Sequence, residues 1–393
     1  MKRITKRPHL RPQIRIQNLH RLCHHRPCHH PRPSPLVLTN QHRHNLHSNN
    51  HHRSLRISRI VLPSRPFFSS SIWTPPFVFL GLGLTLWTYK CIMMVAFQNK
   101  IIYMPNIPPF SRSETVETYE RLCAPVRWEE ESIMAEDNTR LALVVGEIPS
   151  SNAKKDAERL VVLYFQGNAS SMPPRLPYLS STIKEAHRNH SNISIVAVSY
   201  RGYWKSAGKP TGKGIARDAS AALRWMLQRY AHGTERAKIV LWGQSIGAGV
   251  ATNLVAEFLE SQHPSDNSEA VIHGIVMETP FTSLKDLLVA FYPQKWLPYR
   301  YLTPFLRSNW DSVQALERIG RVGRRSQGCL PRIMMLEAER DEVVPAGHAA
   351  KLEGVCKEYG MDVERTVISG ALHTEVVAKP EGRREIARFL KTI

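Results

Sequence analysis

The segment Ile239–Val250 constrains this chain most. It runs from an apolar, β-branched stretch into Gly-Gln-Ser-Ile-Gly at residues 243–247, and then into small and apolar residues. The pattern G-x-S-x-G marks a serine on a tight turn between a strand and a helix. Gly243 and Gly247 stand where side chains would collide with the neighbouring strand and helix. This context predicts that Ser245 is a nucleophile above a parallel sheet, and an ordinary glycine-rich turn is the alternative.

Basic residues are concentrated in the first part of the chain. Residues 1–113 contain 17 Lys and Arg and no Asp or Glu, so they supply +17 of the net charge of +20. The remaining 280 residues are close to neutral, and we therefore expect no nucleic-acid partner. Residues 1–71 are rich in Arg, His, Pro, Asn and Ser, and such a composition cannot bury enough apolar surface to fold. We expect a disordered tail.

Other interpretations of this tail stay open. Two Cys-His-His runs, at residues 23–25 and 28–30, resemble metal-ligand clusters, but no folded frame is predicted around them and we expect no metal. The Arg and Ser content without acids also resembles a mitochondrial transit peptide. Translation from Met93 or Met94 is a third interpretation. The six scattered cysteines predict no disulfide framework.

Residues 72–97 predict a transmembrane anchor. Residues 77–89 are apolar and uncharged, Lys90 interrupts them, and apolar residues then resume. Because about 20 apolar residues span a bilayer, the length suffices if Lys90 reaches one interface beside Trp87 and Tyr89. A buried or interfacial helix is the alternative. The positive-inside rule leaves the tail in the cytosol and sends the rest across. We expect an endomembrane, the endoplasmic reticulum rather than the mitochondrion.

Residues 98–393 have the composition of a folded domain. Apolar runs alternate with helical patterns, which predicts an α/β fold with a mostly parallel, doubly wound sheet. The expected strands are 141–147, 160–165, 193–199, 238–242, 274–278, 332–338 and 363–369. The expected helices are 213–230, 246–260, 347–359 and 381–391.

A nucleophilic serine of this kind needs an acid and then a histidine later in the chain. The strand 332–338 leads into D-x-V-V-P, which makes Asp341 the expected acid, with Glu339 and Glu342 as alternatives and a turn aspartate as the other interpretation. His373 follows the last strand on a glycine-containing loop and is the expected base.

The oxyanion hole of such a site needs two main-chain N–H donors. Ile246, the residue after the serine, should supply one. The other should come from the loop 166–170, Gln-Gly-Asn-Ala-Ser, in which Asn168 or Ala169 could donate.

Four segments together carry a family resemblance: 163–169, 199–211, 242–247 and 278–283. They resemble the membrane-anchored α/β-hydrolase-domain serine hydrolases, in particular the bud-emergence-related group and the lysophospholipid and monoacylglycerol lipases similar to it. The resemblance covers about residues 97–393. It implies an α/β-hydrolase fold and hydrolysis of acyl esters or thioesters, without a cofactor.

The chain departs from the pattern of that family at several positions. The family usually has His, Gly and Asp where Gln166, Trp204 and Ser199 stand, and often has His at Gln244. We expect Trp204 to narrow or reshape the mouth of the pocket. These changes motivate one alternative function, a non-catalytic interaction protein on a hydrolase fold.

Residues 284–328 are longer than a simple crossover between two strands and carry seven aromatic side chains. They predict a cap that admits an acyl chain, with packed crossover helices as the alternative. The leading hypothesis is a serine hydrolase that acts on lipid acyl esters at a membrane. A protein acyl-thioesterase that removes palmitoyl groups is a second enzymatic alternative, and the sequence makes no prediction of oligomeric state.

Overall fold

The computed structural model describes residues 72–149, 159–187, 192–230, 237–262, 271–295, 297–326 and 330–393. The tail expected to be disordered, residues 1–71, lies outside this described part, and so do its two Cys-His-His runs.

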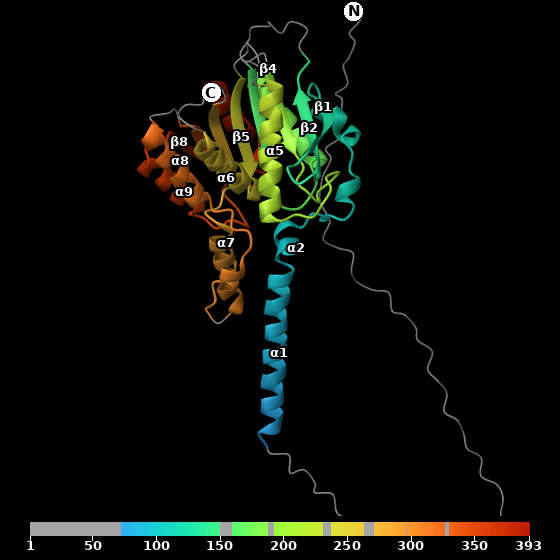
Figure 1. The fold of residues 1–393 in the computed structure, drawn as a ribbon, viewed down its shortest axis with the longest axis vertical. Helices are drawn as coiled ribbons and strands as arrows, with labels where there is room; N and C mark the ends of the chain where they lie inside the picture. The colour runs from blue at the N-terminus through green and yellow to red at the C-terminus, as the bar shows by residue number, and fades with distance from the viewer. Residues whose placement is uncertain are drawn as a thin grey trace, which may run out of the picture. The chain divides into compact units, whose positions relative to one another are not determined.

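An eight-stranded sheet in the order β1-β2-β4-β3-β5-β6-β7-β8 forms the centre of the domain (Figure 1). Its strands are β1 (Arg127–Met134), β2 (Arg140–Glu147), β3 (Arg159–Phe165), β4 (Asn192–Val198), β5 (Ala237–Gln244), β6 (Ile272–Glu278), β7 (Arg332–Ala338) and β8 (Val363–Ile368). The pairs β1–β2 and β2–β4 are antiparallel, and all pairs from β4 to β8 are parallel. The prediction of a mostly parallel, doubly wound sheet is therefore confirmed.

Helices cover both faces of this sheet (Figure 1). One face packs against α5 (Gly212–Tyr230), α6 (Ile246–Ser261), α8 (Ser312–Ser326) and α9 (His348–Glu358). The other face packs against α3 (Glu120–Cys123), α4 (Leu176–His187) and α10 (Pro380–Thr392). Two hydrophobic cores result, one on each side of the sheet.

The alternation of side chains along β3 shows why these residues form a central strand. Val161, Leu163 and Phe165 lie in the core with α5 and α6, whereas Val162 and Tyr164 lie in the core with α4 and α10. Because a strand sends successive side chains to opposite faces, a strand buried on both sides is a continuous apolar run. The expected strands were found from such runs.

The strand β1 and the helix α4 were not among the predicted elements of the domain. The edge strand β1 is largely exposed and carries Glu129, Glu130 and Glu131, so it lacks the apolar run of a central strand. The helix α4 has a proline and several polar residues, yet Leu179, Ile183 and Ala186 pack into the core.

The predicted anchor, residues 72–97, forms the helix α1 (Thr74–Ala96). It has 23 residues with a mean hydropathy of 1.6, and its side chains are almost all exposed to the surroundings. In length and composition it can cross a membrane. The short helix α2 (Gln98–Tyr103) follows and leads into the domain.

The predicted cap, residues 284–328, divides into two parts. The first part contains α7 (Leu284–Phe291) and the 3-10 helix η4 (Pro298–Phe305), which contact each other, and η4 also contacts α1. The second part is α8, which packs against α6 and α9 and buries Leu316 and Ile319 completely. Residues 312–326 are therefore a crossover helix, and only α7 and η4 remain as a candidate cap.

Candidate active site

Ser245 occupies the turn between β5 and α6. Its backbone has φ 52° and ψ −115°, a conformation that costs about 1–3 kcal/mol for a residue with a side chain. The Ser245 N–H donates to the carbonyl oxygen of Glu278 at 2.8 Å, which ties this turn to the end of β6. A Cβ on Gly247 would overlap the carbonyl oxygen of Phe165. The glycine therefore lets α6 start directly against β3.

His373 and Asp341 meet at the carboxyl end of the sheet. The imidazole Nδ1 of His373 lies 2.9 Å and 3.0 Å from the two carboxylate oxygens of Asp341. His373 is nearly buried, with 4% of its surface exposed, and its main-chain N–H donates to the Glu342 carboxylate at 3.0 Å. The structure therefore brings the predicted acid and base together, and it gives Glu342 a different contact.

The carboxylate of Asp341 is held in its charged form. Burial acts to raise the pKa of Asp341, but the hydrogen bond from His373 and those from the N–H groups of Val343 and Val344 outweigh it. These two N–H groups lie 2.9 Å and 2.7 Å from the Asp341 Oδ1. The pKa of Asp341 therefore lies below its ordinary value of 3.8. A charged acceptor on Nδ1 fixes the tautomer of His373 so that its Nε2 is a proton acceptor.

The Nε2 of His373 is buried and has no hydrogen-bond partner among the described residues. Ser245 is also nearly buried, with 5% of its surface exposed. A buried nitrogen without a partner is unusual, because most buried polar atoms are paired. It is free to accept a proton from a nucleophile.

The loop after β3 lies against the Ser245 turn. A Cβ on Gly167 would contact the side chain of Gln244, the residue just before Ser245. The N–H of Ala169 donates to the carbonyl oxygen of Tyr103 at 3.0 Å, so it is already used. Of the two predicted donors in this loop, Asn168 is the one compatible with the observed hydrogen bonds. Ile246 stands at the first position of α6, where main-chain N–H groups are not used within the helix.

The same loop is attached to the segment that follows α1. The Asn168 side chain donates to the carbonyl oxygen of Ile102 at 3.4 Å, and the Ser170 N–H donates to that of Ile107 at 2.5 Å. Ala169 and Ser170 have φ values of 60° and 61°. Contacts with residues 102–107 therefore hold this loop in a strained conformation.

A buried acid near the site was not predicted as a functional residue. Glu278 is completely buried, and the indole N–H of Trp242 donates to its Oε2 at 3.3 Å, whereas its Oε1 has no hydrogen-bond partner among the described residues. Burial raises the pKa of Glu278, and Arg175 and Trp242 oppose the rise without cancelling it. An acid at the end of an apolar strand is a visible signal, but its contacts come from β5 and the segment before α4.

The expectation that Trp204 narrows or reshapes the mouth of the pocket is wrong. It is 1% exposed, packs in the core with α4, and donates its indole N–H to the Glu114 carbonyl oxygen at 2.7 Å. A large apolar side chain with a satisfied N–H is stable in a core. Trp204 is therefore a packing residue and does not line the mouth of the pocket. Gln166 is 2% exposed, and nothing in the described residues satisfies its amide.

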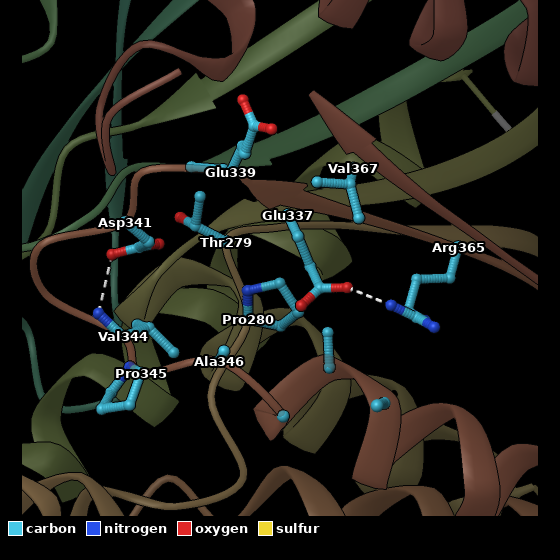
Figure 2. Close-up of a pocket in the computed structure, with 14 residues that line it drawn as sticks. Thr279, Pro280, Glu337, Glu339, Asp341, Val344, Pro345, Ala346, Arg365 and Val367 are labelled. Carbon is cyan, nitrogen blue, oxygen red and sulfur yellow. Dashed lines mark hydrogen bonds and ion pairs between the residues drawn. The ribbon is translucent and has the colours of Figure 1, made fainter. Parts of the chain in front are cut away.

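A hollow of about 310 Å³ with a mixed polar and apolar lining lies beside Asp341 (Figure 2). It is formed by the ends of β6, β7 and β8 and the start of α9, and Glu337 and Arg365 form an ion pair in its wall. Ser245 and His373 lie outside it, so it does not define the space next to the nucleophile. Within the described part of the chain, no group of three or more His, Cys, Asp or Glu side chains is placed to hold a metal.

Comparisons with known proteins agree with this fold. A family model described as an α/β hydrolase fold matches residues 181–376. Protein bem46 of Schizosaccharomyces pombe is 27% identical over 260 residues, which cover 66% of this chain and 75% of that protein. The α/β-hydrolase domain-containing protein WAV2 of Arabidopsis thaliana is 28% identical over 269 residues, 66% of this chain and 76% of the relative.

A third relative carries an activity in its name. Lysophosphatidylserine lipase ABHD12 of Danio rerio is 28% identical over 192 residues, 49% of this chain and 46% of that protein. Among solved structures, an α/β hydrolase from Vibrio vulnificus superposes with a TM-score of 0.51 at 16% identity, covering 75% of this chain and 91% of that one. The latter comparison shows the fold alone. The chain thus belongs to the α/β hydrolases, in the group that includes bem46 and WAV2, and it is an ester-hydrolysing serine hydrolase.

Proposed function

We propose that this chain is a membrane-anchored hydrolase that cleaves acyl esters of lipids, of the lysophospholipid or monoacylglycerol type. Ser245 is the nucleophile, His373 is the general base, and Asp341 orients His373 and stabilises its charged form. The main-chain N–H groups of Asn168 and Ile246 form the oxyanion hole. The lipase name of the ABHD12 relatives supports the substrate class.

In the proposed reaction, the Oγ of Ser245 attacks the ester carbonyl carbon while the Nε2 of His373 takes the serine proton. The carbonyl oxygen becomes an oxyanion, which the two N–H donors stabilise. His373 then gives its proton to the leaving alcohol, and the acyl group stays on Ser245. Water repeats the same steps on this acyl-enzyme, which releases the fatty acid and restores the serine.

One observation carries the proposal: a buried His373 whose Nδ1 is paired with Asp341 and whose Nε2 has no partner in the described residues. A histidine that only supports the fold would use both nitrogens. An N–H on Nδ1 facing a carboxylate leaves Nε2 as the basic nitrogen, which the chemistry of a serine nucleophile needs.

A fluorophosphonate probe tests the nucleophile. The folded protein should be labelled on Ser245, and Ser245→Ala should abolish both labelling and turnover of short acyl esters. Ser261→Ala is the matched control, because Ser261 is an exposed serine at the end of α6. Absence of labelling in a folded wild-type sample contradicts the proposal, and so does labelling that survives Ser245→Ala.

A substrate panel tests the lipid class. Wild type and Ser245→Ala are compared on monoacylglycerols, lysophospholipids and an S-palmitoylated peptide. We expect turnover of the first two classes. Preferential cleavage of the thioester would instead support the protein acyl-thioesterase.

The anchor belongs to the same proposal. The exposed apolar helix α1 supports a single membrane crossing. We propose that the membrane is an endomembrane, the endoplasmic reticulum rather than the mitochondrion. Tagging either end and measuring protease protection in sealed membranes tests the crossing. Release of the protein by alkaline carbonate would contradict a transmembrane anchor.

A further inference from the structure

An apolar groove lies between two parts of the chain that are far apart in sequence. One wall is formed by the last turn of α1 and by α2, with Val95, Ile101 and Ile102. The other is formed by α7 and η4, with Leu288 and Leu302. Gln98 is the single amide-bearing residue in its lining, and the accessible surface of the groove is almost entirely apolar.

Polar contacts at the edges of the groove hold its two walls together. The Gln98 side chain donates to the carbonyl oxygen of Phe305 at 3.1 Å and accepts from the Arg307 N–H at 2.7 Å. The Lys90 ammonium lies 5.1 Å from the centre of the Tyr299 ring. Because the Gln98 amide is occupied by these bonds and one to Val95, the groove offers little to a charged or polar ligand.

The residues that line the groove adjoin the exposed apolar surface of α1, and one of them, Ile102, contacts the loop after β3 that carries Asn168. At its outer side, Ile101 and Phe305 are 50% and 60% exposed, and they continue the exposed apolar surface of α1. At its inner side, the Ile102 carbonyl oxygen accepts from the Asn168 side chain. A ligand in the groove would therefore lie between a surface suited to lipid and the loop proposed to hold the oxyanion.

We propose that this groove binds the acyl chain of a lipid that enters from the bilayer, on its way to Ser245. This inference rests on the proposed lipid-ester hydrolase function. An unbranched hydrocarbon chain matches a lining that is apolar and whose one amide is already bonded. The hollow measures about 80 Å³, so it holds one segment of a chain while the rest lies along the exposed apolar walls. Contacts between α2, η4 and the acyl chain thus determine which acyl chains the enzyme accepts.

Chain-length dependence gives the first test, made with the full-length protein in phosphatidylcholine vesicles. Because the acyl chain moves into the groove from lipid and not from water, the preference for longer chains should come from packing contacts with the groove and should level off once the groove is filled. Leu302→Trp fills the groove, and we expect it to lower the ratio of kcat/KM for palmitoyl over butyryl monoacylglycerol at least tenfold. Ile101→Trp should act in the same direction, and its half-exposed site tolerates the larger side chain.

Leu122→Trp is the matched control, because Leu122 is an exposed leucine on α3. It should leave the palmitoyl-to-butyryl ratio within twofold of wild type. Labelling of Ser245 by a fluorophosphonate shows that each variant is folded. Equal ratios in wild type, Leu302→Trp and Ile101→Trp would overturn the groove proposal while leaving the hydrolase function intact.

A binding test uses no turnover at all. A palmitoyl monoacylglycerol with a diazirine in mid-chain is photolysed with Ser245→Ala in vesicles. We expect cross-links on α2, α7 and η4, reduced at least fivefold by adding Leu302→Trp. Cross-links confined to α1 would overturn the groove, because they show bulk lipid only. Loss of all ester turnover and of labelling in wild type would instead refute the hydrolase function itself.

Discussion

The main-chain N–H of Ala169 donates to the carbonyl oxygen of Tyr103 at 3.0 Å, and this bond joins the loop after β3 to the helix that follows α1. Tyr103 is completely buried and also accepts, through its hydroxyl, the indole N–H of Trp310 at 3.0 Å. The position of α2 and the position of the candidate oxyanion loop are therefore coupled.

Tyr103→Phe removes the acceptor for the indole N–H of Trp310. Leaving a buried donor unsatisfied costs about 1–3 kcal/mol, so thermal unfolding should occur at a lower temperature. The main-chain carbonyl of Tyr103 that accepts from Ala169 is retained in this variant, so kcat should stay within a few-fold of wild type. Tyr119→Phe is the control, since the Tyr119 hydroxyl donates to the partly exposed Glu114 at 2.8 Å. An unchanged melting temperature for Tyr103→Phe would contradict the prediction.

Asp341→Asn should lower kcat by about 10⁴-fold, by analogy with the loss of the orienting acid in other serine hydrolases. The pKa of Asp341 lies below 3.8, so in the wild type the carboxylate is charged and can orient His373 throughout pH 5–9. A depressed pKa also means that this carboxylate stabilises the fold above pH 3.8, and that its contribution is lost as pH falls through the lowered pKa.

Glu339→Gln tests whether His373 is oriented by Asp341 or by the nearby Glu339. The Glu339 carboxylate accepts from the N–H of Gly370 at 2.6 Å, whereas the hydrogen bonds of His373 go to Asp341 and Glu342. The rate of ester hydrolysis should stay within a few-fold of wild type. A loss as large as that of Asp341→Asn would assign the orienting role to Glu339 instead. The pH–rate profiles of the two variants are measured side by side.

Gly247→Ala should prevent stable folding, because its Cβ would overlap the carbonyl oxygens of Phe165 and Gln166. Backbone atoms cannot move aside, so we expect a loss above the usual 1–3 kcal/mol for overpacking. Gly354→Ala in α9 is the control. Nothing lies within 4 Å of its added Cβ, and it should stabilise the helix by about 0.5–1 kcal/mol. Chemical unfolding midpoints of the two variants test the contrast.

The sequence predicted the parts of this molecule that have a local signature. The central strands are continuous apolar runs because both of their faces are buried, and Ser245, Asp341 and His373 follow strands in the order of a known motif. The strand β1 was missed because it lies at an edge, where three consecutive Glu side chains are tolerated. The contact of Tyr103 with Ala169 has no local pattern, since it joins segments separated by three strands.

Glu278 stands in the sequence as an acid at the end of an apolar strand, but its burial and its contacts are seen only in the structure, and they give the last prediction. Its carboxyl group is completely buried, one oxygen has no partner among the described residues, and burial raises its pKa despite Arg175 and Trp242. A raised pKa means that the folded state retains the proton more strongly than the unfolded state. Its favourable contribution is therefore present below the ordinary value of 4.5 and is lost as pH rises through the raised pKa.

Glu278→Gln keeps an acceptor for the Trp242 N–H and removes the cost of a buried charge. The variant should gain stability relative to wild type as pH rises from 5 to 8, by about 2–4 °C in Tm for each 1 kcal/mol. Glu364→Gln is a control, because Glu364 pairs at the surface with Arg388 at 2.7 Å. Thermal unfolding of the three proteins at both pH values makes the comparison. If the difference between Glu278→Gln and wild type is the same at pH 5 and pH 8, Glu278 does not change protonation in this range.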